Sequence, residues 1–234
     1  MTQPKPITEI WKPELVRLPK LTTSRKLFRI FGHSLIKFVA KMCLNITVEG
    51  VENFPKDGPL LIVINHIGDA DAVAVVSQLP FKPDAIGKIE LYDLPILGKM
   101  MHWYGIIWLH RGKPDIKALR SAIDGLAEKR IIIIAPEGRY SLTGGLEEGT
   151  GGAAYLAYKS GAPVLPIVVT GTENENVYGN LKKLRRAKVK VTVGKMLKLN
   201  NQLETRQEAI NQGTQQIMQA LANLLPEKYR GEYL

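Results

Sequence analysis

The sequence predicts an α/β fold, with a mostly parallel central sheet flanked by helices and an N-terminal amphipathic helical segment. Three observations predict it. The chain has 234 residues, of which 45% are hydrophobic and 23% charged, which is typical of a packed globular core. Several short segments, such as residues 60–64, are apolar without interruption. These segments alternate with stretches of helical periodicity, as in sheets that helices cover on both faces.

The N-terminal part differs in character from the rest of the chain. Residues 1–20 contain four prolines and are expected to form an extended arm. Residues 22–45 carry apolar side chains at helical spacing, with basic side chains mostly on the other side, which predicts a basic amphipathic helix. The apolar positions are Leu27, Ile30, Phe31, Leu35, Phe38 and Met42, and the basic ones are Lys26, Arg29, His33, Lys37 and Lys41.

Two interpretations of this helix remain open. It could pack on the domain with its charges in water, or lie in a membrane interface with its apolar side in lipid and its lysines near lipid phosphates. On either interpretation we divide the chain into residues 1–45, the arm and helix, and residues 46–234, the α/β domain.

Strands and helices then alternate along the chain. The apolar runs predict buried strands, and the strict alternation of the last strand predicts a half-exposed one. The first helix is expected to begin with Asp69 or Asp71 as its cap, and residues 89–104 to be a mixed helical and loop stretch around a proline. The predicted strands are 59–65, 84–88, 105–111, 130–138, 162–171 and 187–195, and the predicted helices are 69–79, 114–129, 149–160 and 201–225.

Charge and composition restrict the partners. The net charge of +10 and the pI near 9.6 predict an anionic partner. Nucleic acid is not expected, because the basic residues lack the interleaved aromatic side chains of a stacking surface. Cys43 is the single cysteine, which excludes an intramolecular disulfide and a zinc cluster of cysteines. We expect neither a signal peptide nor a transmembrane helix, because the first residues lack an apolar core and no run approaches ~18 apolar residues.

Polar side chains gather where three predicted strands end. Ligand sites in open α/β sheets form at such ends. The groups are Asn65, His66, Asp69 and Asp71 after the first strand, His110 and Arg111 after the third, and Glu137, Gly138 and Arg139 after the fourth.

His66 is the candidate general base. Histidine accepts protons near neutral pH and works best when a carboxylate holds its other ring nitrogen. Asp71 follows five residues later, so a tight turn before the helix would bring its carboxylate back to the imidazole. Two alternatives stay open: a structural turn with a helix cap, and a metal site with Asp69. No metal is expected, because the other histidines show no spacing that completes a zinc site.

The remaining motifs are weaker. No G-x-S-x-G motif is present, so the attacking hydroxyl would come from the substrate. Gly138 permits a sharp exit from its strand, and Arg139 offers a forked donor for phosphate or carboxylate, or a surface salt bridge. The glycine-rich residues 147–155 lack the lysine of a phosphate-binding loop, so a nucleotide site is not favoured.

Four motifs in order, NHIGDAD, GIIWLHR, PEGRYS and APVLPIVV, resemble the glycerolipid acyltransferase superfamily, and within it the 1-acyl-glycerol-3-phosphate acyltransferases. The matching residues are His66 and Asp71 in the first motif, Gly105, Ile107 and Arg111 in the second, and Pro163 and Pro166 in the fourth. The third motif departs from the family's P-E-G-T-R-S. Arg139 stands one place early, Tyr140 occupies the place of the family's arginine, and Glu147 and Glu148 stand where a basic residue is usual.

The resemblance implies transfer of a fatty acyl group from acyl-CoA or acyl-acyl carrier protein to a hydroxyl of a lysophospholipid, foremost 1-acyl-glycerol-3-phosphate. It implies that His66 is the base and Asp71 its support. No bound cofactor or metal is implied, since the thioester is a co-substrate. By the resemblance we expect Arg111, Glu137, Gly138 and Arg139 to bind substrate.

The resemblance also implies a peripheral position on an anionic membrane, and the expected lack of a signal peptide and of a transmembrane helix places it on the cytoplasmic face. The basic residues 182–190 would then meet lipid head groups, or would form the solvated edge of a hairpin. Two other functions remain open. One is acylation of a different lysolipid or glycolipid, such as lyso-ornithine lipid, for which the shifted arginine is the reason. The other is a non-catalytic, membrane-associated lipid-binding protein.

Overall fold

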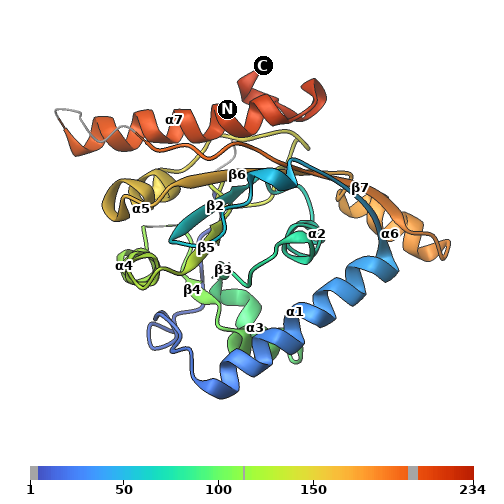
Figure 1. Ribbon diagram of the computed structural model, residues 1–234, viewed down its shortest axis with the longest axis horizontal. Coiled ribbons are helices and arrows are strands. Elements are labelled where there is room, and N and C mark those ends of the chain that lie inside the picture. Colours follow the sequence, from blue (N-terminus) through green and yellow to red (C-terminus); the bar gives the residue numbers. More distant parts are fainter. Residues whose placement is uncertain (1–4, 113, 200–204) are drawn as a thin grey trace.

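The computed structural model describes residues 5–112, 114–199 and 205–234, which form three layers (Figure 1). The strands are β1 (Leu44–Glu49), β2 (Leu60–Ile64), β3 (Asp84–Lys88), β4 (Ile107–Leu109), β5 (Ile131–Ile134), β6 (Val164–Thr170) and β7 (Ala187–Val193). The α-helices are α1 (Thr23–Cys43), α2 (Asp71–Gln78), α3 (Leu97–Tyr104), α4 (Ile116–Ala127), α5 (Gly152–Ser160), α6 (Asn174–Lys182) and α7 (Arg206–Leu224).

The seven strands form one sheet in the order β1-β7-β6-β2-β5-β3-β4. All neighbours pair in parallel except β6 and β7, which are antiparallel. The five strands from β6 to β4 therefore share one direction, and their carboxyl ends meet at one edge of the sheet. The predicted α/β fold with a mostly parallel sheet is confirmed.

The continuous apolar run of β2 is explained by its place in the middle of the sheet. Leu61 and Val63 belong to the core under α4, α5 and α7, whereas Leu60, Ile62 and Ile64 belong to the core under α2 and α6. Since successive side chains of a strand point to opposite faces, a strand covered on both faces must be apolar at every position. Figure 1 shows α7 and α5 on one side of the sheet, and α2 with α1 and α3 on the other.

The predicted strands are confirmed, and so are the helices, with shorter bounds. The first part of the predicted helix 201–225, residues 201–204, lies outside the described residues. Two elements were not predicted. The edge strand β1 pairs on one side only and buries little beyond alternate positions. Helix α6 has the polar sequence NENVYGNLK and Val177 as its buried residue, so it shows no apolar stripe.

One prediction about local structure is wrong, and one open alternative is excluded. Helix α2 begins at Asp71, its N-cap is Ala70, and no side chain caps it. The carboxylate of Asp71 turns back to the preceding loop instead. The basic residues 182–190 do not form a hairpin edge, because β7 lies between β1 and β6 and α6 intervenes before it.

Helix α1 packs on α2 and α3 (Figure 1), and its inner side carries charged as well as apolar residues. Its buried residues include Arg29 and His33, whereas the apolar side chains of its outer face are exposed. These exposed side chains are Leu27, Ile30, Phe31, Phe38, Val39 and Met42. The Arg29 guanidinium bonds the buried carboxylate of Asp84 and the carbonyl of Lys82, so a charge holds the helix to the domain. The division of the chain at residue 45 stays a prediction.

Candidate active site

The candidate site lies at the edge where the five parallel strands end. His66 follows β2, and its Nδ1 lies 2.7 Å from Oδ2 of Asp71. Asp71 is fully buried, whereas the side chain of His66 is 26% exposed. Since a carboxylate only accepts hydrogen bonds, the Nδ1 atom carries the proton and Nε2 carries the free electron pair. This is the tautomer that a general base requires.

The loop between β2 and α2 is built around the Asp71 carboxylate. Its Oδ2 atom also accepts the backbone N–H groups of Ile67 (2.7 Å) and Gly68 (2.9 Å). Three N–H donors on one oxygen offset the cost of burying the charge. Gly68 is required because a Cβ there would lie 2.0 Å from the carbonyl oxygen of Thr172. The sequence thus bends the chain back at Gly68 and aims Asp71 at His66.

The PEGRYS motif is bound directly to His66. The backbone N–H of His66 donates to Oε1 of Glu137 (3.0 Å), and the N–H of Ser141 donates to the carbonyl of His66 (2.7 Å). The Tyr140 ring packs on the imidazole at a centroid distance of 4.1 Å. His66 and Glu137 are 71 residues apart in the sequence, so these contacts bring the first and third motifs together in a single site.

Tyr140 continues into a cluster of hydroxyl groups beside His66. Its hydroxyl donates to Oδ1 of Asp69 (2.7 Å), and the hydroxyl of Tyr178 donates to Oδ2 of the same carboxylate (2.9 Å). The hydrogen bond from Tyr140 lowers the pKa of Asp69, and that from Tyr178 lowers it further. Burial, followed by the bond to Asp69, raises the pKa of Tyr140, which therefore stays a hydroxyl donor at neutral pH.

Glu137 is buried beneath the site. Its second oxygen, Oε2, accepts the backbone N–H of Glu147 (2.9 Å), so the carboxyl group joins the end of β5 to two separate loops. Burial raises the pKa of Glu137 to about 8, although both backbone N–H donors act to lower it. Gly138 follows with φ of 72°, the left-handed conformation that the predicted sharp exit requires. The substrate-binding roles predicted for Glu137 and Gly138 stay predictions.

The two predicted arginines each have a carboxylate partner. Arg139 donates from Nε to Glu147 (2.7 Å), and both side chains are almost fully buried. Arg111 donates to Glu90 at 3.0 Å, and its backbone is joined to Thr8 of the N-terminal arm. The sequence identified both arginines but not these carboxylates as partners. Their predicted roles as substrate ligands stay predictions.

Lys88 adds a cation from the end of β3. Its ammonium lies 5.5 Å from the centre of the Tyr140 ring, whose neighbour is His66. It is close enough to Asp69 to lower the pKa of that carboxyl group. A positive charge therefore lies near Tyr140 and Asp69, in the cluster of hydroxyl groups beside His66.

A second pair repeats the spacing of the first. Nδ1 of His110 lies 2.9 Å from Oδ2 of Asp115, again five residues apart. Here the Nε2 atom accepts the backbone N–H of Lys12 (3.1 Å), and Trp11 of the arm stacks on the ring at 4.5 Å. Asp115 also caps α4. This histidine has no free ring nitrogen, so it fastens the arm and is not a candidate base.

Two residues of the site, Tyr178 and Asn174 on α6, were not predicted from the sequence. Asn174 accepts the backbone N–H of Asp69 (2.9 Å) and so places that residue. The one available signal was the turn GTENEN directly after the buried strand β6, at the same edge of the sheet. Across the described ranges, no three His, Cys, Asp or Glu side chains form a group that could hold a metal ion.

The sequence and the fold are similar to those of known proteins. The Acyltransferase family model matches residues 45–170. A 1-acyl-sn-glycerol-3-phosphate acyltransferase of Chlamydomonas reinhardtii is 31% identical over 80% of this chain and 54% of its own length. A chloroplastic 1-acyl-sn-glycerol-3-phosphate acyltransferase of Arabidopsis thaliana is 30% identical over 71% of this chain and 49% of its own length. The chain thus spans about half the length of these relatives.

A solved structure shares the fold. It is the 1-acyl-sn-glycerophosphate acyltransferase PlsC of Thermotoga maritima, which is 24% identical and superposes with a TM-score of 0.66. The similarity covers 87% of this chain and 84% of that one.

Proposed function

Because the chain belongs to the Acyltransferase family, we propose that it transfers a fatty acyl group from a thioester, acyl-CoA or acyl-acyl carrier protein, to a hydroxyl of a lysophospholipid. The named relatives make 1-acyl-glycerol-3-phosphate the first candidate acceptor. The observation that carries the proposal is the His66–Asp71 contact of 2.7 Å at the open edge of the sheet.

In the proposed mechanism, Nε2 of His66 takes the proton of the acceptor hydroxyl as the oxygen attacks the thioester carbonyl. The new C–O bond forms, the C–S bond breaks, and the proton passes to the departing thiolate. Asp71 holds the imidazole in the required tautomer and stabilises its charged form. Lys88 and Arg111 would attract the anionic head group of the acceptor, since both lie at the same edge.

A substitution of His66 tests the chemistry. We expect His66→Gln to fold normally and to lose about 10²–10⁴-fold in kcat, which is the usual contribution of a general base. The matched control is His110→Gln, which alters the second pair with the same spacing. It should lower the unfolding temperature, because it loosens the arm, while kcat per folded molecule stays near that of the wild type. A His66→Gln variant within a few-fold of wild-type kcat would contradict the proposal.

A second candidate acceptor is favoured by one observation. Tyr140 stands where the resembled family carries arginine, and Arg139 is paired with Glu147 in a nearly buried position. A head group other than a phosphate monoester, such as that of lyso-ornithine lipid, would suit such a site. Rates with one acyl-CoA and a panel of purified lysolipids would rank the two acceptors. Higher kcat/KM with lysophosphatidate than with every other lysolipid would exclude the second.

We further propose that α1 lies in the membrane interface. Its outer side exposes Leu27, Phe31 and Phe38, each more than half accessible, and an exposed apolar stripe of this size is typical of an interaction surface. Within the described ranges, no helix is both long enough and apolar enough to cross a bilayer. A helix lying flat would leave the lipid acceptor in the bilayer while the strand ends reach its head group.

A further inference from the structure

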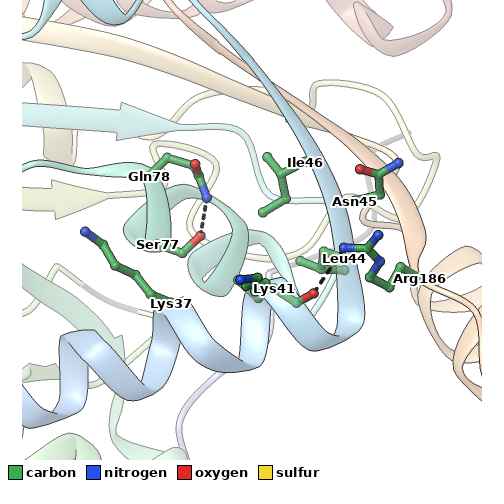
Figure 2. A pocket seen from close by; sticks show the side chains of 9 residues that line it. Lys37, Lys41, Leu44, Asn45, Ile46, Ser77, Gln78 and Arg186 are labelled. Atoms are coloured by element: carbon green, nitrogen blue, oxygen red, sulfur yellow. Dashed lines mark hydrogen bonds between the residues drawn. The ribbon is translucent and has the colours of Figure 1, made fainter.

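A basic cavity opens between α1, the start of β1 and the end of α2 (Figure 2). It has a volume of about 240 Å³. Its lining residues are Lys37, Ala40, Lys41, Leu44, Asn45, Ile46, Ser77, Gln78 and Arg186, none of which is acidic. The cavity is distinct from the candidate active site, because Ser77 and Gln78 end α2 whereas Asp71 begins it.

The cationic side chains of this cavity carry more positive charge than the negative helix ends around it can neutralise. The carboxyl ends of α1 and α2 both point here, and each carries the equivalent of about half a negative charge. Arg186 neutralises part of this negative charge, since its Nη1 donates to the carbonyl of Lys41 (3.4 Å). Three cationic side chains against about one negative charge still leave a surplus of about two positive charges. An anion would neutralise that surplus.

The lysines stand beside the apolar face of the helix. Lys37 and Lys41 are one turn apart and face the cavity. Phe38 and Met42 follow them by one position each, about 100° around the helix, and are 61% and 60% exposed. If Phe38 and Met42 lie among acyl chains, the two ammonium groups lie at the depth of lipid phosphates, the usual place for such lysines at an interface.

The loop after α6 extends the same surface. Leu184 is 97% exposed and held at φ of 54°, and its neighbours Lys183, Arg185 and Arg186 are basic. The backbone bonds from Leu184 to Leu181 and from Arg185 to Asn180 fix the loop in this shape. An exposed leucine between cations suits a membrane that has both an apolar interior and an anionic surface.

We propose that the cavity binds the phosphate group of an anionic phospholipid in the membrane on which α1 lies. The proposal rests on the membrane position proposed for α1 but not on the acyl-transfer chemistry. Lys37, Lys41 and Arg186 neutralise the phosphate. The amide of Asn45 offers a neutral donor, as does the second N–H of Gln78, whose first donates to Ser77 (2.7 Å). The acyl chains of the lipid run along Phe38 and Met42.

Vesicle binding tests the proposal. The pocket variant is Lys37→Gln/Lys41→Gln/Arg186→Gln, and the probe is phosphatidylcholine vesicles with or without phosphatidylglycerol. We expect the pocket variant to lose on the order of 100-fold in binding to the anionic vesicles, since each of the three basic residues near such a surface contributes about fivefold. Binding to pure phosphatidylcholine should be unchanged, because the apolar face is intact.

A matched control removes the same charge elsewhere. Lys159, Lys195 and Lys198 are exposed and lie on α5 and on the segment that joins β7 to α7. Their triple change to Gln should reduce binding to anionic vesicles less than about threefold, because charges farther from the membrane than ~8 Å are screened. Equal losses in the two triple variants, or no loss in the pocket variant, would overturn the proposal. Equal unfolding temperatures exclude a folding defect.

Two further measurements are needed. The first distinguishes a lipid phosphate from free phosphate as the ligand, and the second distinguishes membrane binding by the cavity from a part in acyl transfer. Titration with inorganic phosphate in the absence of vesicles should show no saturable heat. Saturable heat that the pocket variant abolishes would assign the site to the free ion and overturn the lipid assignment. With lysophosphatidate and acyl-CoA dispersed in detergent, the pocket variant should keep the wild-type rate, which supports a role in binding to the membrane. A selective loss of that rate in a folded pocket variant would place the cavity in catalysis and overturn that role.

Discussion

Two single residues shape the candidate site: Asp71, whose carboxylate accepts several hydrogen bonds, and Tyr140, which stands where the resembled family carries arginine. Asp71 accepts three N–H groups on one oxygen and thereby sets both the loop and the tautomer of His66. Tyr140 covers one face of the imidazole and is held in turn by Asp69. We expect Tyr140 to act as a positioning residue that keeps the imidazole in its working orientation.

Two substitutions separate the ring of Tyr140 from its hydroxyl. Tyr140→Phe keeps the packing on His66, so kcat should stay within about threefold of the wild type. Tyr140→Ala leaves the imidazole free to tilt, and a misplaced base costs about tenfold to hundredfold in kcat. The KM for the thioester donor should be unchanged in both variants. Steady-state kinetics decide the matter, and equal kcat values for the Phe and Ala variants would refute the positioning role.

Between elements, the buried pair of Arg29 and Asp84 joins α1 to the start of β3. Arg29→Met should lower the free energy of unfolding by about 3 kcal/mol, since it leaves a buried carboxylate without its main partner. Arg130, at 3.7 Å from Asp84, supplies the remaining compensation. Lys26→Met, an exposed change on the same helix, is the control and should cost less than about 0.5 kcal/mol. Urea unfolding curves that coincide for the two variants would show that the pair does not stabilise the helix.

The elements also show what the sequence could and could not predict. Strands such as β2 and β5 were predictable, because burial on both faces demands an apolar residue at every position. Helix α6 was not, because it buries one valine and its contribution to the site is polar. The partners of Arg111 and Arg139 were equally hidden. Glu90 precedes Arg111 by 21 residues, and Glu147 follows Arg139 by eight residues in an irregular loop, so no helical or strand spacing connects either pair. His66 and Asp71 could be paired because a single turn separates them.

At the level of the whole molecule, the protonation of Glu137, which lies beneath the candidate site, affects the stability of the fold. Its pKa is raised to about 8 in the folded protein from 4.5, so the folded state holds a proton that the unfolded chain releases. This contribution to stability is therefore full below pH 4.5 and is lost as the pH rises to about 8. The side chain of the variant Glu137→Gln cannot titrate, so this pH-dependent contribution to the unfolding free energy should be absent from it.

The comparison is made by measuring unfolding free energies of both proteins across that range. The variant should be less stable than the wild type at low pH, because an amide cannot accept both backbone N–H groups with one oxygen. The difference in unfolding free energy between the wild type and the variant should become smaller with rising pH, by at most about 1.4 kcal/mol per pH unit. A gap that is constant between pH 4.5 and 8 would show that Glu137 does not hold the proton.

The three-layer arrangement separates two tasks in space. The carboxyl ends of five strands collect the polar residues, whereas α1 and the loop after α6 carry the exposed apolar and basic side chains. The two regions are connected through α2, which has Asp71 at one end and the basic cavity at the other. A membrane contact at α1 thus leaves the strand ends unobstructed.

The chain contains the histidine–aspartate spacing twice, at His66 and at His110, and the two pairs can be compared within one molecule. A pattern search would return both His66 and His110 with equal weight, yet one imidazole meets solvent and the other meets a peptide N–H. An acylating reagent for imidazoles should therefore modify the first and spare the second. The contact made by Nε2, which no spacing rule encodes, distinguishes the candidate base His66 from His110, which fastens the arm.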